Sequence, residues 1–179
     1  MENNPEFANI YPIGKFQEPE NFTSEMRREY MLRLDSFPNR LAETVAHLRE
    51  FDLGKRYRSG GWTIRQITHH LCDSHLNAYT RFKLALTEDN PTIKPYDENK
   101  WSALEEVNTS HPTLSIQLLT FLHQRWVNLL DEMKPDDFEK TYFHPQYQKA
   151  TSLNAALALY AWHSDHHLEQ IKVALKLGK

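Results

Sequence analysis

The chain has 179 residues, of which 40% are hydrophobic and 12% aromatic, a composition that fits one folded domain with a buried core. A net charge of −3 and scattered lysines and arginines exclude the basic patch that binding to nucleic acid or to a membrane surface would require. One cysteine excludes an internal disulfide and is typical of the reducing cytosol, and no apolar run is long enough to span a bilayer. We therefore expect a cytoplasmic protein whose single domain covers residues 1–179.

The chain begins with a segment, residues 1–22, that contains several prolines and has no sustained periodicity. We expect an extended arm that packs on the domain through Ile10, Tyr11 and Ile13. From Thr23 onward, apolar residues recur at spacings of three and four, which predicts a helix. Pro38 lies inside this stretch, so the helix should kink or break into two helices in line.

A second helix is predicted from about Thr63 to Thr87. Thr63 followed by Gln66 is a capping-box pattern, in which each side chain bonds to the backbone N–H of the other residue. The proline-containing residues 88–112 that follow should form a long loop, with a short helix near 98–107.

The sequence His111-Pro112-Thr113 introduces a third long helix, which Pro135 ends. Its predicted buried face comprises Leu118, Leu122, Trp126 (or Arg125), Leu129 and Met133. Residues 140–153 are rich in β-forming and turn residues and predict a small hairpin or an extended crossover. Ser152 can then cap a last helix, Leu153–Leu177. The expected fold is an all-α four-helix bundle with a long loop between helices two and three, and five glycines are few for a sandwich or barrel.

The last helix carries three histidines within the sequence YAWHSDHHLEQI. Its inward line at helical spacing is Ala156, Tyr160, His163, His167, Ile171 and Ala174. His163 and His167 therefore point toward the core, whereas His166 lies off that line. Two histidines four residues apart on a helix can hold one metal ion without bending the helix.

The second long helix offers a third ligand within THHLCDSH. His70 shares the inward face of Ile67 and Ser74, while His69 lies toward the flank. Three imidazoles from two helices predict a metal site inside the bundle, and the alternative is that buried histidines are satisfied by hydrogen bonds alone. Ser164 follows His163, so the glutamate base of the HExxH metalloproteases is excluded at this position.

Polar residues follow His70 along one helix face and are candidates for contacts to a substrate. Arg81 or Asn77 could bind a substrate anion, and Ser74 lies between them and His70; the alternative is that these residues meet solvent at the bundle edge. Asp73 could accept a hydrogen bond from His69 or act as a base, although a surface ion pair is the simpler role.

The remaining candidates have structural interpretations. Cys72 lies about 160° around the helix from His70 and is expected to pack in the core. Trp62, Tyr160 and Trp162 are expected in the core, with one of them as a candidate pocket wall, and Asp165 and Glu169 on solvated faces. No role is assigned to His47, His111, His123 and His144.

Three stretches, YPIGKF, GGWTIRQITHHLCDSHLNAYTRFKLALTEDNPTIKPYDENKW and YAWHSDHH, resemble the DinB-like superfamily, specifically its YfiT-type branch. They extend from the arm to the last helix, and the departures, Phe16 and Asp165, do not touch the candidate ligands. The resemblance implies a four-helix bundle, a homodimer to which the 88–112 loop could contribute, and one zinc or nickel ion on His70, His163 and His167.

The resemblance also implies an enzyme with a small-molecule substrate. The first expectation is a metal-dependent hydrolase that activates water, and the alternative is a transferase that activates a low-molecular-weight thiol such as bacillithiol. Three neutral imidazoles leave the ion an open position, where water with a pKa near about 7 or an ionised thiol could be the nucleophile. A third possibility is a non-catalytic bundle in which the metal only joins two helices.

Overall fold

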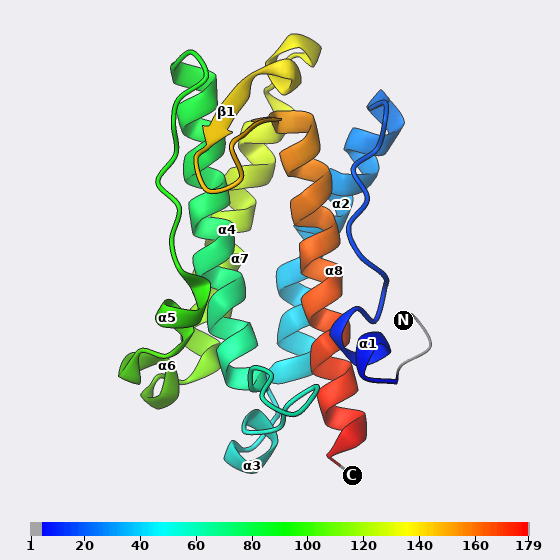
Figure 1. Ribbon diagram of the computed structural model, residues 1–179, viewed down its shortest axis with the longest axis vertical. Coiled ribbons are helices and arrows are strands. Elements are labelled where there is room, and N and C mark those ends of the chain that lie inside the picture. The colour runs from blue at the N-terminus through cyan, green and yellow to red at the C-terminus, as the bar shows by residue number, and fades with distance from the viewer. Residues whose placement is uncertain (1–4, 179) are drawn as a thin grey trace.

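The computed structural model describes residues 5–178, and four long helices dominate it (Figure 1). They are α2 (Ser24–Val45), α4 (Ile64–Thr87), α7 (Pro112–Asp131) and α8 (Leu153–Leu177). The shorter elements are α1 (Pro5–Ile10), α3 (Glu50–Leu53), α5 (Glu98–Ser102), α6 (Glu105–Thr109), the 3-10 helix η1 (Pro135–Glu139) and the strands β1 (Thr141–His144) and β2 (Lys149–Ser152). The expected all-α bundle with its long loop and small hairpin is confirmed. None of the described helices is long and apolar enough to cross a membrane.

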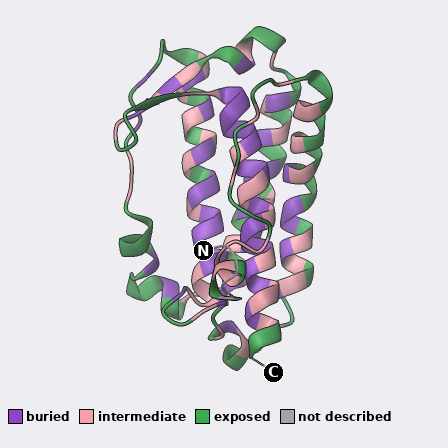
Figure 2. Cartoon of the chain, turned by 45° about the vertical axis from the view of Figure 1, so that its right-hand side comes forward, coloured by how far each residue is buried: buried purple, intermediate pink, exposed green. Residues whose placement is uncertain are grey.

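The bundle has two pairs of parallel helices. Helices α2 and α8 run in one direction, and α4 and α7 run in the other (Figure 1). Each helix packs on its parallel partner and on one member of the other pair, because α2 also packs on α7 and α4 also packs on α8. Because α4 and α7 are parallel, the chain must return along the length of the bundle between them, which explains the long 88–111 connection. Buried residues lie on the inward faces of the helices, and exposed residues lie outside (Figure 2).

Side-chain caps fix the starts of the two helices that carry the candidate ligands. Thr63 Oγ1 accepts from the Gln66 backbone N–H at 3.1 Å, and Gln66 Oε1 accepts from the Thr63 backbone N–H at 3.0 Å. Ser152 Oγ accepts from the Ala155 backbone N–H at 3.1 Å. These bonds satisfy backbone donors that the first turn of a helix leaves unpaired. The predicted capping box and the predicted Ser152 cap are both confirmed.

Pro38 does not break the first long helix. The helix α2 is continuous over its 22 residues, and Pro38 lies inside it. A proline has no backbone N–H, so the carbonyl of Leu34, four residues earlier, loses its donor within the helix. His123 of α7 contacts this carbonyl oxygen through Nδ1 at 2.6 Å. A side chain from the neighbouring helix therefore supplies the missing hydrogen bond.

The buried face of α7 differs from the predicted one. Its buried residues are Pro112, Ile116, Leu119, Leu122, His123, Trp126 and Leu130. Leu118 is 52% exposed, so its predicted place in the core is wrong. Leu129 and Met133 are only partly buried. Leu122 and Trp126 are buried as predicted. The helix also carries a second apolar line that faces solvent, and its inward line includes a histidine, so hydrophobic periodicity identifies only part of the buried face.

The N-terminal arm is only partly extended. Residues 5–10 form the short helix α1, and the rest of the arm runs beside α8 (Figure 1). Ile10 packs against the core, but Ile13 is 40% exposed and does not pack as expected. The Phe16 ring lies 5.9 Å from that of Trp162, which holds the arm on the outer side of α8.

The long connection and the hairpin hold each other at one end of the bundle. Strand β1 pairs antiparallel with β2, with Thr141 opposite Ser152. Ile93 N–H donates to the Phe143 carbonyl at 3.0 Å, and Phe143 N–H donates to the Pro91 carbonyl at 2.9 Å. The connection thus follows β1 before it forms α5 and α6, two short helices where the sequence predicts one.

An ion-pair cluster joins α8 to α2. Asp165 accepts from Arg33 at 2.6 Å and from Arg40 at 2.7 Å, and its side chain is only 20% exposed. The expectation of a solvated Asp165 is therefore wrong. The periodicity of α8 places this residue away from the core but does not show that two arginines of α2 face it.

Candidate metal centre

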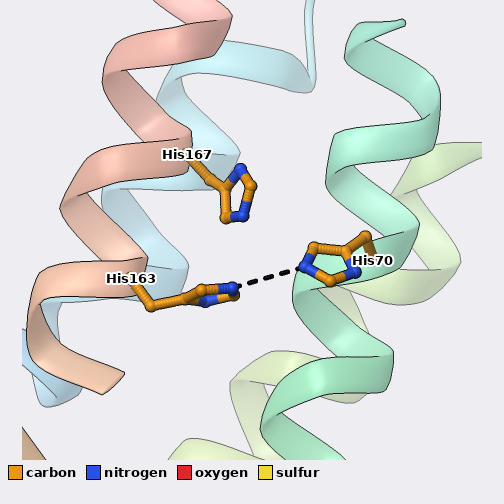
Figure 3. A group of neighbouring side chains, drawn as sticks. All are labelled: His70, His163 and His167. Atoms are coloured by element: carbon orange, nitrogen blue, oxygen red, sulfur yellow. Dashed lines mark hydrogen bonds between the residues drawn. The ribbon is translucent and has the colours of Figure 1, made fainter. Parts of the chain in front are cut away.

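Three histidines from two helices converge inside the bundle. His70 comes from α4, and His163 and His167 come from α8 (Figure 3). Each contributes one ring nitrogen to a group in which all three atoms lie within 4.8 Å of one another. The Nε2 atoms of His70 and His163 are 3.3 Å apart. The structure thus brings together the three residues that the sequence predicts as ligands.

The spacing and the protonation of these rings suit a divalent ion. Zinc–nitrogen bonds of about 2.0–2.1 Å at tetrahedral angles place two ligand nitrogens about 3.3–3.4 Å apart, which the 3.3 Å pair of His70 and His163 matches. Burial holds the pKa of all three imidazoles well below the usual value, and the neighbouring histidines lower it further. The rings are therefore neutral at neutral pH, which is the form that binds metal.

A chain of hydrogen bonds runs from His163 to the backbone of α2. His163 Nδ1 lies 3.3 Å from His75 Nε2, and His75 Nδ1 lies 2.8 Å from His123 Nε2. The chain ends where His123 Nδ1 meets the Leu34 carbonyl oxygen at 2.6 Å. His75 and His123 are 0% and 1% exposed, so neither ring can exchange these partners for water.

The carbonyl oxygen at the end of this hydrogen-bond chain determines the tautomer of each of the three histidine rings. A carbonyl oxygen only accepts, so His123 Nδ1 must carry the hydrogen. The Nε2 atom of this neutral ring then accepts from His75 Nδ1–H, and His75 Nε2 accepts from His163 Nδ1–H. The lone pair of His163 is left on Nε2, the atom that faces His70. Metal-binding histidines generally donate their second ring N–H in this way, which fixes the ring orientation.

His167 is oriented by a separate contact. Its Nδ1 lies 2.8 Å from Gln170 Oε1, an atom that only accepts, so His167 also keeps its lone pair on Nε2. Gln170 in turn donates through Nε2 to the Ile10 carbonyl oxygen at 2.8 Å. The N-terminal arm therefore helps to fix the position of this ring.

A cavity of about 350 Å³ opens beside the three histidines. Helices α4 and α8 form one side of it, and the 88–111 connection and the hairpin form the other. Its lining includes Trp62, Ser74, Arg81, Tyr96, Glu98, Tyr142, His144, Tyr147, Leu159 and Tyr160. Such a mixture of aromatic walls and a few polar groups is typical of sites for small molecules.

Two of the four other candidate residues lie in this cavity. Ser74 is buried, and Arg81 is half-buried with one guanidinium nitrogen 3.3 Å from the Tyr160 hydroxyl. The amide of Asn77 instead donates to the Asp73 carbonyl oxygen at 2.8 Å. Burial and nearby Glu106 raise the pKa of the Asp73 carboxyl to about 6, but this residue does not line the cavity.

His69 does not contact Asp73. Its ring nitrogens lie 2.7 Å from Ser115 Oγ and 3.3 Å from the Ser110 carbonyl oxygen. The structure therefore does not support Asp73 as the partner of His69, or Asp73 and Asn77 as contacts to a substrate in this cavity. Cys72 is buried as expected, and burial raises the pKa of its thiol to about 12.

The aromatic candidates divide between the cavity and the arm. Trp62 lines the cavity, and its ring lies 4.6 Å from that of His70. Tyr160 is buried and lines the same cavity. Trp162 lies outside it and stacks on His166 at 4.5 Å, consistent with the predicted position of His166 off the inward line.

Sequence reasoning missed two groups of residues at this site. His75 is five positions after His70, so the two residues do not share one face of the helix. His123 lies on a part of the α7 surface that hydrophobic periodicity does not predict to be buried. Tyr96 and Tyr142 come from the connection and the hairpin, whose position over α4 and α8 depends on tertiary packing. The histidine content of THHLCDSH was the one available signal for His75.

The family model of the DinB superfamily matches residues 33–171, and the chain belongs to this family. YfiT of Bacillus subtilis (strain 168) is 42% identical over 161 residues, which cover 90% of each chain. The solved structure of YfiT, described as a probable metal-dependent hydrolase with an unusual four-helix bundle topology, superimposes with a TM-score of 0.92 and 40% identity over 96% of this chain and 98% of that chain.

One further relative and one structure of the same fold were also found. A protein of Bacillus mycoides (strain KBAB4), also named for metal-dependent hydrolysis, is 47% identical over 90% of this chain and 92% of its own. The mycothiol-dependent maleylpyruvate isomerase has a TM-score of 0.64 at 15% identity, over 84% of this chain and 66% of that chain, so it shares the fold.

Proposed function

We propose that the protein is a metal-dependent hydrolase that holds one divalent ion, zinc or nickel, on His70, His163 and His167. The observation that carries this proposal is the convergence of three neutral imidazoles beside an open cavity. When bound, an ion held by three neutral ligands keeps its full charge and lowers the pKa of a water molecule to about 7. The relatives named for metal-dependent hydrolysis support the same class of activity.

The residues around the histidines would orient a small substrate and limit the access of bulk water. Trp62 covers one side of His70, and Leu159 and Tyr160 line the cavity from α8. The hydrogen-bond chain through His75 and the contact to Gln170 hold the rings of His163 and His167 in one orientation. Such preorganised ligands reduce the rearrangement that binding and reaction would otherwise require.

A thiol S-transferase is the alternative function, because a thiol in the open position would ionise for the same reason as water. The cavity supports a catalytic site of either kind over a metal that only joins two helices. Within residues 5–178, no fourth histidine, cysteine or carboxylate joins the group of three.

The proposal is tested by measuring bound metal in untagged protein that has been purified without chelators. We expect close to one equivalent of zinc or nickel, and His163→Ala should lose it while retaining its helical circular dichroism. His47→Ala, at an exposed residue outside the cavity, is the matched control. Only traces of metal in the wild-type protein would contradict the proposal.

The reaction is tested by supplying the metal-loaded protein with ester and amide panels in parallel with a thiol and a generic electrophile. Metal-dependent ester or amide cleavage supports the hydrolase, and metal-dependent consumption of the thiol supports the transferase. A loaded protein with neither activity would favour the non-catalytic bundle.

We also propose that the protein is a cytoplasmic homodimer. Its single cysteine is consistent with a reducing compartment. An exposed apolar line on α7, formed by Leu114, Leu118 and Phe121, offers a surface for association together with Leu104 of the connection. Light scattering at micromolar concentration tests the dimer, and a monomeric mass would contradict it.

A further inference from the structure

We propose that the cavity takes a substrate with an anionic group, a carboxylate or a phosphate, that binds the Arg81 guanidinium while the reacting group lies at the three histidines. This inference rests on the proposed metal-dependent function and names the class of its substrate. It is carried by the position of Arg81, by the lack of a carboxylate partner for it among residues 5–178, and by the hydroxyl groups near it.

Arg81 lies on the same helix as His70 and faces the same cavity. Side chains on a helix tilt toward its N-terminus, so Arg81 extends back along α4 toward the histidines. A guanidinium nitrogen lies 3.3 Å from the Tyr160 hydroxyl. The centre of the Tyr160 ring is 5.8 Å from that of His163, so Tyr160 contacts the guanidinium through its hydroxyl and lies beside a candidate ligand with its ring.

No carboxylate pairs with Arg81 among residues 5–178. Three other partly buried arginines have carboxylate partners: Arg33 and Arg40 bind Asp165, and Arg65 binds Glu50. The partly buried Arg27 has no carboxylate partner but donates to the Asn154 amide oxygen and the Phe22 carbonyl oxygen. A guanidinium withdrawn from water without a counter-ion is costly, and an incoming carboxylate or phosphate can engage its planar fork through two parallel hydrogen bonds.

Hydroxyl groups beside Arg81 add hydrogen-bond donors for an anion. Tyr142 and Tyr160 interact with Arg81, and Ser74 and Tyr96 line the same cavity. Burial raises the pKa of Tyr96, Tyr142 and Tyr160, so their hydroxyls stay protonated and can donate. These groups line one continuous cavity with the three histidines.

The charge balance of the cavity also favours an anion. The candidate ligand histidines are neutral, and Glu98 is the one carboxylate that lines the cavity among residues 5–178. Glu98 is exposed and forms no ion pair with Arg81. Arg81 together with a divalent ion therefore leaves the cavity positive. An anionic substrate would neutralise part of this charge in a partly desolvated site, where attraction is stronger than in water.

The inference is tested with bifunctional probes on protein loaded with Co²⁺, whose thiolate absorption reports a thiol on the metal. The anionic probes are mercaptoacetate, mercaptopropionate, mercaptohexanoate and mercaptoethyl phosphate. Each is compared with a neutral hydroxyl-terminated thiol of matched length. We expect one chain length at which the anionic thiol binds at least about tenfold more tightly than its neutral partner, the effect of one charge-assisted contact. The carboxylate and phosphate probes distinguish the two anions.

Arg81→Gln should bring the anionic and neutral probes to within about twofold of each other and leave the neutral affinities unchanged. Arg81→Lys should retain part of the preference. Arg125→Gln, at an exposed arginine of α7, removes the same charge far from the cavity lining and should change nothing.

Equal binding of charged and neutral thiols by the wild-type protein would overturn the inference without any variant. An undiminished preference in Arg81→Gln, with an unaltered Co²⁺ spectrum before thiol addition, would overturn it as well. Failure of Co²⁺ to bind the three histidines would instead contradict the proposed function, so the two failures are distinguishable.

Discussion

At the scale of single residues, His75 and His123 fix the tautomer and the ring orientation of His163 in the candidate metal centre. Neither ring reaches the cavity, yet together they determine which nitrogen of His163 carries a hydrogen. The backbone oxygen of Leu34 is the fixed end, because it can only accept. A buried imidazole without such a partner could adopt either tautomer or rotate away from its partner ligands.

His75→Phe should therefore weaken metal binding by about 10- to 100-fold, the usual effect of removing a group that orients a ligand. The phenyl ring fills most of the space but cannot accept from His163 Nδ1–H. Competition with a chromophoric chelator measures the affinity, and circular dichroism verifies the fold. His47→Phe, at an exposed residue, should retain wild-type affinity. Equal affinities in the two variants would refute this role for His75.

The pKa of His123 predicts how the stability of the metal-free protein depends on pH. Burial lowers this pKa to about 4, whereas an unfolded histidine has a pKa of about 6.5. Protonation therefore favours the unfolded chain, so the contribution of His123 is fully present above about pH 6.5 and is lost as the pH falls toward about 4.

Urea denaturation between these pH values should show a falling free energy of unfolding, with a shallower slope for His123→Gln than for the wild-type protein. The glutamine cannot titrate but retains donor and acceptor atoms. Parallel slopes for the two proteins would show that His123 does not contribute.

At the scale of elements, side-chain caps fix the starts of α4 and α8, and a proline in α2 allows a hydrogen bond between α2 and α7. The Thr63 box and Ser152 define where α4 and α8 begin, and so which residues face inward along each. Pro38 leaves the Leu34 carbonyl available to His123 without interrupting α2. The start of a helix can be predicted from local sequence, but the use of a free carbonyl depends on which helix packs beside it.

Thr63→Ala should reduce the free energy of unfolding by about 1 kcal/mol, because it removes the acceptor for the Gln66 backbone N–H. Chemical denaturation measures this loss. Thr80→Ala is the control on the same helix: Thr80 is exposed and bonds only to the Leu76 carbonyl in mid-helix, so its removal should change stability little. Equal losses in both variants would show that the cap is not responsible.

At the scale of the whole molecule, local pattern predicts the four long helices and the three converging histidines well. Helical periodicity is a property of each segment, and His70, His163 and His167 all follow it. The same pattern is only partly correct on α7, where Leu122 and Trp126 are buried as predicted but Leu118 is exposed and His123 is buried. It also cannot predict that Tyr96 and Tyr142 cover the site, because their position depends on how the connection and the hairpin pack together.

Metal should stabilise the whole bundle, because the ligands come from helices that separate on unfolding. Binding to the folded state alone contributes about 2.7 kcal/mol at a free metal concentration of about 100 Kd, or roughly 5–10 °C in Tm for a chain of this size. Differential scanning calorimetry with and without zinc measures the shift. His163→Ala should show none, and a wild-type Tm independent of zinc would contradict a folded-state site.

The contact of Gln170 with the Ile10 carbonyl gives the N-terminal arm a practical importance for anyone who engineers this protein. A shortened version that starts at α2 would keep the four long helices and could pass ordinary tests of solubility and secondary structure. It would nevertheless lose the backbone oxygen that steadies Gln170, and through it His167. Removing the arm would therefore give a folded sample in which the candidate metal centre is less well ordered than in the full chain.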